Sequence, residues 1–167
     1  MATVKHRFQA ADAFFPASNF AQYSAVAGTN FPVASLAFDA ATEETVYFQV
    51  PTMDYGSGNL TINLKWYADT ASSGGVTFGA SLACITANTD STDIETKAFG
   101  SENTASDTHL GTTGQRLHEF SITLSNLDSI ATNDYAILKL ARKVSGGSDT
   151  MTGDCLIVEV GVEYSDT

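Results

Sequence analysis

The histidines His6, His109 and His118 are the side chains best suited to proton transfer or metal binding near neutral pH. None of them lies beside a cysteine or a carboxylate at the spacing of a metal site. No serine stands in the Gly-x-Ser-x-Gly turn that exposes a nucleophile beside an acid–base partner. The sequence therefore predicts no catalytic residue, no metal ligand and no cofactor, and we expect a protein that is not an enzyme.

Carboxylates gather at two places in polar stretches of the chain. Asp90, Asp93 and Glu95 share one loop, and Asp149 and Asp154 flank the last turn. Oxygen-rich loops can bind calcium, but this spacing is not that of an EF-hand and defines no coordination set. We therefore expect these groups to be hydrated loop carboxylates.

Arg142 is a charged residue at a position expected to face the core. It is in phase with Leu138 and Leu140 near the end of an apolar strand. A buried guanidinium needs a partner, and Asp149 or Asp154 in the following turn could bind it through two parallel hydrogen bonds. The sequence predicts a structural lock made by Arg142, Asp149 and Asp154. The alternative is an arginine that binds a ligand or a neighbouring subunit.

The two cysteines, Cys84 and Cys155, are too few for a disulfide framework. Cys84 is in phase with the apolar residues of its strand and should be a small buried hydrophobe. Cys155 is out of phase with the apolar face of its strand. We expect both thiols to be reduced.

Two aromatic residues, Trp66 and Tyr55, could stack against a sugar ring, as aromatic residues do in lectin-like sites. Trp66 is, however, in phase with Leu60 and Leu64. That phase favours a place in the core over a place in a binding site.

Alternation of apolar and polar residues, the pattern of a half-buried strand, recurs through most of the chain. It predicts strands over residues 34–38, 46–50, 60–68, 76–85, 120–124, 134–144 and 155–164. In the last strand the apolar face is expected to hold Leu156, Val158, Val160, Val162 and Tyr164. About eight antiparallel strands and no convincing helix predict an all-β fold, a single antiparallel β-sandwich of jelly-roll or other type.

Residues 1–31 differ from the rest, because their aromatic residues follow neither the period of a strand nor that of a helix. We expect an extended N-terminal arm over 1–31 and a β-sandwich domain over 32–167. The arm either lies on a neighbouring subunit or covers its own sandwich, since large exposed aromatic patches are unusual. The residues predicted to contact a subunit or partner are Phe8, Phe14, Phe15, Phe20 and Tyr23.

The segment Thr86–Gln115 is rich in Thr, Ser, Asn, Asp and Gly, with Ile94, Phe99 and Leu110 as its large apolar residues. We expect one short strand over 94–99 inside a long loop. Long loops in compact domains are often functional or disordered, so this loop is the candidate for a variable tip.

The chain is acidic, with a net charge of −11, and only 16% of its residues are charged. Such a chain lacks the cationic surface that binds phosphates, which argues against nucleic acid and anionic membranes as partners. It has no apolar run long enough for a transmembrane helix. The N-terminus lacks the apolar core of a signal peptide, and we expect synthesis in a cytoplasm.

Two stretches of strands and turns resemble a group of small jelly-roll virion proteins of tailed bacteriophages. The first is marked by Asp134-Tyr135, Leu138, Leu140, Arg142, Asp149-Thr150, Gly153-Asp154 and Tyr164. The second is marked by Pro51, Asp54-Tyr55, a glycine turn, an alternating strand that reaches Trp66, and a Gly-x-x-x-Gly strand. The resemblance extends roughly from Val46 to Tyr164 and favours the jelly roll among sandwiches.

The resemblance implies a virion structural protein, most directly a capsid decoration or cement protein that stabilises the major capsid lattice. It implies a homotrimer on the capsid surface, whose partners are its own copies and the major capsid protein or another virion protein. The alternative is a receptor- or carbohydrate-binding module of a tail or head fibre, which would use the long polar loop. One fold hosts many functions, so the strand pattern does not choose between them.

Overall fold

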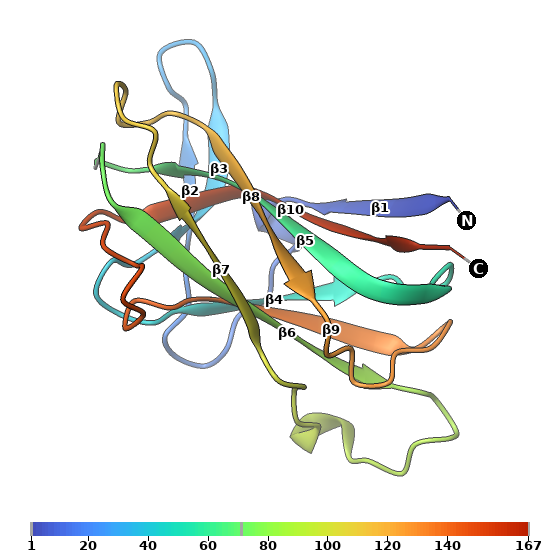
Figure 1. The fold of residues 1–167 in the computed structure, drawn as a ribbon. Coiled ribbons are helices and arrows are strands. Elements are labelled where there is room, and N and C mark those ends of the chain that lie inside the picture. Colours follow the sequence, from blue (N-terminus) through green and yellow to red (C-terminus); the bar gives the residue numbers. More distant parts are fainter. Residues whose placement is uncertain (1, 71, 167) are drawn as a thin grey trace.

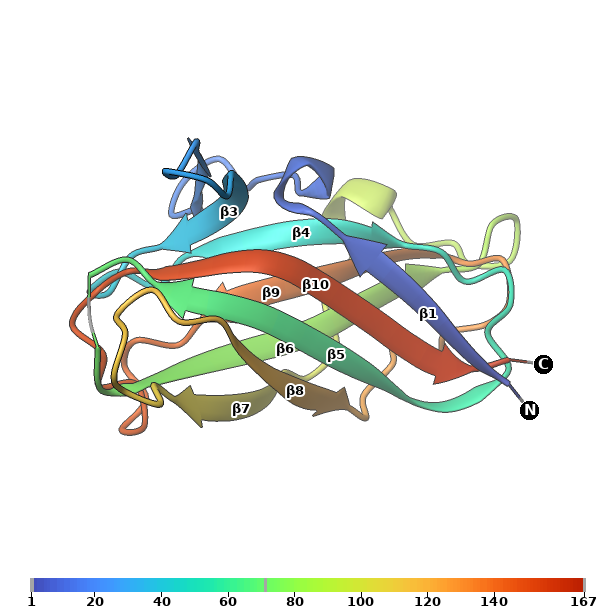
Figure 2. The same ribbon diagram turned by 90° about the horizontal axis from the view of Figure 1, so that it is seen from above.

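The computed structural model describes residues 2–70 and 72–166 and consists of two antiparallel β-sheets that pack face to face (Figure 1, Figure 2). The larger sheet contains β1 (Thr3–Phe8), β2 (Gln22–Val26), β3 (Val33–Phe38), β5 (Ser57–Ala68), β8 (His118–Leu124) and β10 (Cys155–Ser165). The smaller contains β4 (Thr45–Val50), β6 (Gly75–Ile85), β7 (Asn103–Thr108) and β9 (Tyr135–Arg142). Two 3-10 turns, η1 (Ala10–Asp12) and η2 (Ile94–Thr96), lie between strands.

The chain passes repeatedly from one sheet to the other. The six-stranded sheet has the order β2-β3-β10-β5-β8, with β1 also paired to β10, and the four-stranded sheet has the order β4-β9-β6-β7. From β3 to β6, and again from β7 to β10, consecutive strands lie in alternate sheets, which is the wrapping of a jelly roll. The predicted all-β sandwich is therefore confirmed, with more strands than the roughly eight expected.

The core lies between the sheets and is formed by the apolar half of each alternating strand. Leu60, Leu64 and Trp66 of β5 are fully buried. Phe38 of β3 meets Phe78 of β6 edge to face, with 5.1 Å between ring centroids. Burial of a large apolar side chain stabilises a fold by roughly 1.5–3 kcal/mol. These residues therefore fix which face of each strand turns outward.

β10 does not alternate over its whole length. Its register with β5 shifts between Ile157 and Glu159, and such a bulge bends the strand and changes which residues face the core. Cys155 and Ile157 face the core before the shift, and the even-numbered residues face it afterwards. The expectation that Leu156 and Val158 lie on the core face was therefore wrong, and Cys155 is fully buried.

The N-terminal segment forms part of the sandwich. β1 pairs with the C-terminal half of β10, and β2 pairs with β3. Phe8 packs against Phe48 of the core, with 5.5 Å between ring centroids. Between β1 and β2 the chain forms isolated bridges to β4 at Phe14 and Phe20. Within the described chain the segment thus packs on its own sandwich, while Phe14, Phe15 and Tyr23 keep exposed surface.

The polar segment 86–115 divides into two parts. The strand expected over 94–99 was wrong, because the Asp93 side chain accepts a hydrogen bond from the Glu95 N–H and begins the η2 turn. A strand forms further along, where β7 pairs with β6. The part before β7 is tied to the four-stranded sheet, with the Gly100 N–H donating to Leu82 O at 2.9 Å.

Two features stand at opposite ends of the six-stranded sheet. The β2–β3 hairpin projects beyond the rest of the sandwich at one end (Figure 1). The described chain ends lie side by side at the other. There the Ala2 N–H donates to Asp166 Oδ1 at 2.7 Å and the Asp166 N–H donates to Ala2 O at 3.1 Å.

Candidate functional site

Arg142 is buried at the end of β9, and its guanidinium is surrounded by acceptors. Nε and Nη2 donate to the two carboxylate oxygens of Asp149 at 3.0 and 2.9 Å. Nη1 and Nη2 also donate at 3.1–3.3 Å to the main-chain oxygens of Phe38, Asp39, Met151 and Gly153. Because these acceptors come from the end of β3 and from the β9–β10 loop, the arginine joins the two sheets.

The observed lock contains one of the two predicted carboxylates, Asp149, and not Asp154. Asp149 is the residue that pairs with Arg142, and it also accepts from the Thr77 N–H at 3.0 Å. Asp154 accepts from the Ala40 N–H at 3.2 Å instead. The pair Arg142–Asp149 is therefore a structural element, and Asp154 holds the neighbouring turn.

A second buried cluster lies where β5, β7 and β8 meet. Trp66 stacks on His118, with 4.4 Å between ring centroids, and donates from Nε1 to Asp107 Oδ2 at 3.0 Å. The His109 ring lies 4.5 Å from that of His118. Burial, together with His109, lowers the pKa of His118, so its ring is neutral at pH 7. Trp66 is fully buried and offers no surface to a sugar.

Tyr55 is closed to ligands as well. Its hydroxyl donates to Gly58 O at 2.9 Å, and its ring meets Tyr164 edge-on at 5.6 Å. His6 shares a hydrogen bond of 2.8 Å with the Tyr164 hydroxyl. The two aromatic residues considered for sugar stacking from the sequence, and the three histidines, thus serve packing and hydrogen bonding within the sandwich.

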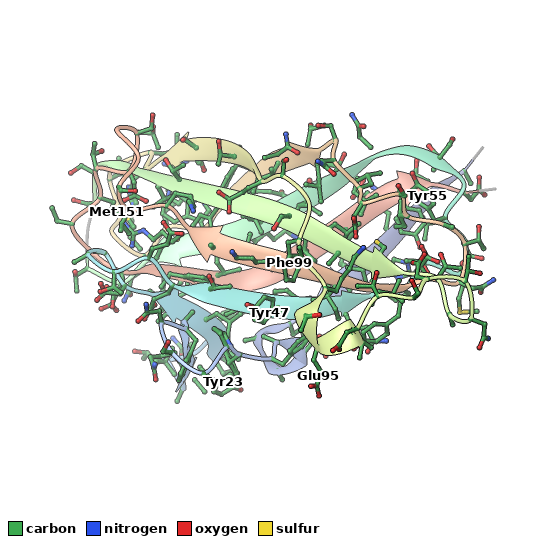
Figure 3. The ribbon with its side chains drawn as sticks, turned by 90° about the horizontal axis from the view of Figure 1, so that it is seen from below. Tyr23, Tyr47, Tyr55, Glu95, Phe99 and Met151 are labelled. Atoms are coloured by element: carbon green, nitrogen blue, oxygen red, sulfur yellow. The ribbon has the colours of Figure 1, made fainter. Side chains whose placement is uncertain are left out.

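A hollow of about 210 Å³ opens on the outer face of the four-stranded sheet. We call it the aromatic pocket; its lining includes Phe14, Tyr47, Phe99, Tyr135 and Ile137, with Glu95 and Lys97. The Tyr47 ring stacks on Phe99, with 5.7 Å between centroids and 17° between planes, and contacts Phe14 at 5.5 Å. Figure 3 shows Tyr47 and Phe99 over the middle of this face, with Glu95 to one side.

The pleat of the sheet explains why these side chains meet. Val46 and Phe48 of β4 point into the core, so Tyr47 between them points outward. Gln49 lies opposite Ile137 in the neighbouring strand, which places Ile137 on the same outer face. The segment after η2 lies over this outer face and places the Phe99 ring against that of Tyr47.

Two charged groups, Glu95 and Lys97, lie at the pocket. Lys97 Nζ lies 2.9 Å from Asp128 Oδ2, and this hydrogen bond raises the pKa of the lysine, which keeps it charged. An apolar floor with a few polar groups at its edge is the usual composition of a small-ligand site. The arrangement can stack a ring and hydrogen-bond its hydroxyl groups.

This pocket was predictable from the sequence only in part. Phe14 was expected at an interface and Glu95 and Phe99 in the polar segment 86–115, but Tyr47 and Tyr135 were not recognised. The signal was present, because both tyrosines occupy outward positions of alternating strands, where small or polar residues are usual.

The residues predicted at a subunit interface do not form one surface. Phe8 is half-buried against the core. Phe15 packs on Phe20, with 5.5 Å between ring centroids, and Phe14 lies on the aromatic pocket. Tyr23 stands on β2, where it is 53% exposed. Phe14, Phe15 and Tyr23 thus retain exposed surface, whereas Phe8 and Phe20 are partly covered by their own chain.

Within residues 2–70 and 72–166, no three His, Cys, Asp or Glu side chains come together in a way that could hold a metal ion. In the same part of the chain no helix has the length and apolar character needed to cross a membrane. Both cysteines are free and buried.

Solved structures with a similar fold include carbohydrate-binding modules. The CBM22-1 xylan-binding domain from Paenibacillus barcinonensis Xyn10C has a TM-score of 0.52 and 10% identity, over 98% of this chain and 94% of that one. The CBM36-1 domain of a multidomain xylanase from the hindgut metagenome of Trinervitermes trinervoides has a TM-score of 0.51 and 9% identity, over 95% and 96%. The mannan-recognising module TmCBM27 has a TM-score of 0.51 and 6% identity, over 98% and 99%. No family model and no curated protein matches the sequence.

Proposed function

We propose that this chain is a non-catalytic module that binds a neutral carbohydrate in the aromatic pocket. The observation that carries the proposal is the Tyr47–Phe99 stack on the outer face of the four-stranded sheet, with Glu95 beside it. A sugar ring presents apolar C–H groups on its faces and hydroxyl groups at its edge. The pocket offers aromatic surface for the first and charged groups for the second.

The fold supports the same class of ligand. The similar structures include a xylan-binding domain and a module with specific mannan recognition. Because identity to them is low, their fold alone supports the proposal, and the residues that bind are those of this chain's own pocket.

The volume of the pocket and the net charge of the chain restrict the class of ligand. A hollow of about 210 Å³ is smaller than the pockets of roughly 300–1,000 Å³ that enclose a drug-sized ligand. It suits one ring of a glycan whose remaining sugars continue over the sheet surface. The net charge of −11 repels polyanions, which favours a neutral glycan over a sulfated or uronic one.

A glycan array with the intact protein, followed by calorimetric titration of the best ligand, tests the proposal. Tyr47→Ala should weaken binding about tenfold, because an aromatic contact contributes up to about 1.5 kcal/mol. Tyr23→Ala is the matched control, since Tyr23 is exposed and lies at a distance from the pocket (Figure 3). An array without any bound glycan, or equal affinity of the two variants, would contradict the proposal.

A second candidate is the virion structural protein that the sequence resemblance implies, most directly a trimeric capsid decoration protein. Besides the resemblance, its support is an exposed apolar stretch that includes Phe31, which is 79% exposed. Quantitative mass spectrometry and labelling of purified particles test it. Many copies spread over a capsid shell would favour decoration, whereas a few copies at a tail or fibre would favour the glycan-binding module.

A further inference from the structure

β2 is the edge strand of the six-stranded sheet, and its outer edge is unpaired within the described chain. The free N–H and C=O groups of such an edge can pair with a strand of another molecule. Proteins usually prevent this with charged residues, prolines or bulges on the edge strand. β2, with the sequence QYSAV, has none of these and pairs regularly with β3 over its whole length.

The other edges of the two sheets are protected. β1 carries Lys5 and Arg7. The edge of β4 is covered by residues 14–20, which bridge to it at both ends of that segment. β7 and β8, the edge strands on the far side, lie close together and shield each other (Figure 2). β2 is therefore the edge of the described sandwich that is left open to pairing.

The surface around β2 is also uncharged. Residues 13–38 contain no Asp, Glu, Lys, Arg or His, in a chain of net charge −11. Large apolar side chains are exposed along this stretch at Phe14, Phe15, Tyr23, Val26 and Phe31. Two copies of an acidic protein repel each other, and this stretch is where two copies can approach without facing each other's carboxylates.

We propose that a second copy of this chain binds to β2, by antiparallel pairing of the two β2 strands about a two-fold axis at Ser24. Ser24 is the central residue of β2, so this register pairs every residue of the strand. Gln22 lies opposite the partner's Val26, and Tyr23 lies opposite the partner's Ala25, which sets a large side chain beside a small one. A two-fold contact uses the same surface on both copies and closes as a dimer.

The same register also sets the position of the hairpin tips. Val26 falls opposite the partner's Gln22, so the hairpin tip after Val26, with the exposed Phe31, extends past the end of the partner's β2. Strand pairing then brings the exposed Tyr23 and Val26 of both copies into the contact. The six-stranded sheet becomes continuous through both copies.

Sedimentation of the full chain over a range of concentrations tests whether two copies associate through β2. The natural sequence should shift from the monomer mass to the dimer mass. Tyr23→Lys, which puts a charge on the edge strand, should raise the dissociation constant at least about tenfold. Leu110→Lys is the matched control, because Leu110 is 64% exposed and lies outside the stretch.

Cysteine cross-linking tests the register. In Ser24→Cys the two new thiols face each other across the axis, with Cα atoms about 4.5–5.5 Å apart, within the range of a disulfide. Mild oxidation should give a covalent dimer, whereas Ser121→Cys on the edge strand β8 should not. The native cysteines are buried and do not interfere. A monomer at every concentration, an oligomer unaffected by Tyr23→Lys, or equal cross-linking of the two variants would overturn the proposal.

Discussion

Replacing Arg142 with methionine removes a cation from a place that water does not reach. The side chains of Arg142 and Asp149 are 0% and 2% exposed. Methionine fills part of the volume but leaves Asp149 with the Thr77 N–H and without its cation. Breaking one side of a buried ion pair costs about 3–5 kcal/mol. Main-chain oxygens around the site lose a donor as well, so we expect the upper half of that range.

Urea unfolding, monitored by the fluorescence of Trp66, measures this loss in the free energy of unfolding. Trp66 is the single tryptophan and is fully buried. The double variant Arg142→Met/Asp149→Leu removes both charges. It should be more stable than the sum of the single effects by at least about 1 kcal/mol, because neither charge is left unpaired. Lys143→Met is the control, as its ion pairs with Glu43 and Glu102 are partly exposed and should each contribute less than about 1 kcal/mol.

Two results would refute this reasoning. One is an Arg142→Met variant that unfolds at the same urea concentration as the natural sequence. The other is a pair of single-variant costs that simply add in the double variant, because additivity would mean that Arg142 and Asp149 do not stabilise each other.

Three further predictions concern buried or constrained groups. The pKa of His118 is lowered by burial from its ordinary value of 6.5, so the folded state binds fewer protons than the unfolded chain. Stability should be complete above that value and fall as the pH drops below it, by at most about 1.4 kcal/mol per pH unit. His118→Phe, which keeps an aromatic ring in the stack, should flatten this slope in urea titrations, and an unchanged slope would contradict the assignment. Gly58 and Gly74 both have positive φ, at +82° and +93°, but only at Gly74 would a Cβ meet backbone, at 2.8 Å. Alanine should cost about 1–2 kcal/mol at Gly58 and clearly more at Gly74, as thermal unfolding of the two variants will show. Burial raises the pKa of Cys84 to about 12 and also raises that of Cys155. Mass spectrometry should therefore find both thiols unmodified by iodoacetamide in the native protein and modified in urea; rapid native labelling would be the opposite result.

Strands with large apolar residues on one face were predictable from alternation, as in β5 and β9. The pattern failed where local geometry changed it. The bulge after Ile157 turns Cys155 toward the core, although alternation predicted that it would face away. No residue type in the sequence marks the position of this bulge. β7 was missed because its sequence, NTASDT, has no large apolar side chain and is a strand only through pairing with β6.

The aromatic pocket was less predictable than the fold. Its residues come from the segment after β1, from β4, β6 and β9, and from the segment around η2. Only the pairing order of the sheet brings Tyr47 and Tyr135 to one face, and only the path of the loop brings Phe99 to Tyr47. Arg142 was easier, because its predicted partner Asp149 is near in sequence and a buried guanidinium restricts its partners to anions and carbonyl oxygens.

The adjacency of Ala2 and Asp166 has a consequence for engineering. A host protein interrupted at one surface loop could carry this sandwich as an insertion, because the chain enters and leaves the domain at nearly the same point. For the same reason a short peptide could join the two ends in a circular permutant opened at the tip of the β2–β3 hairpin. In an insertion the host would lie at the end of the sandwich away from that hairpin (Figure 1). The outer face of the four-stranded sheet and the open edge at β2 would then both point into solvent.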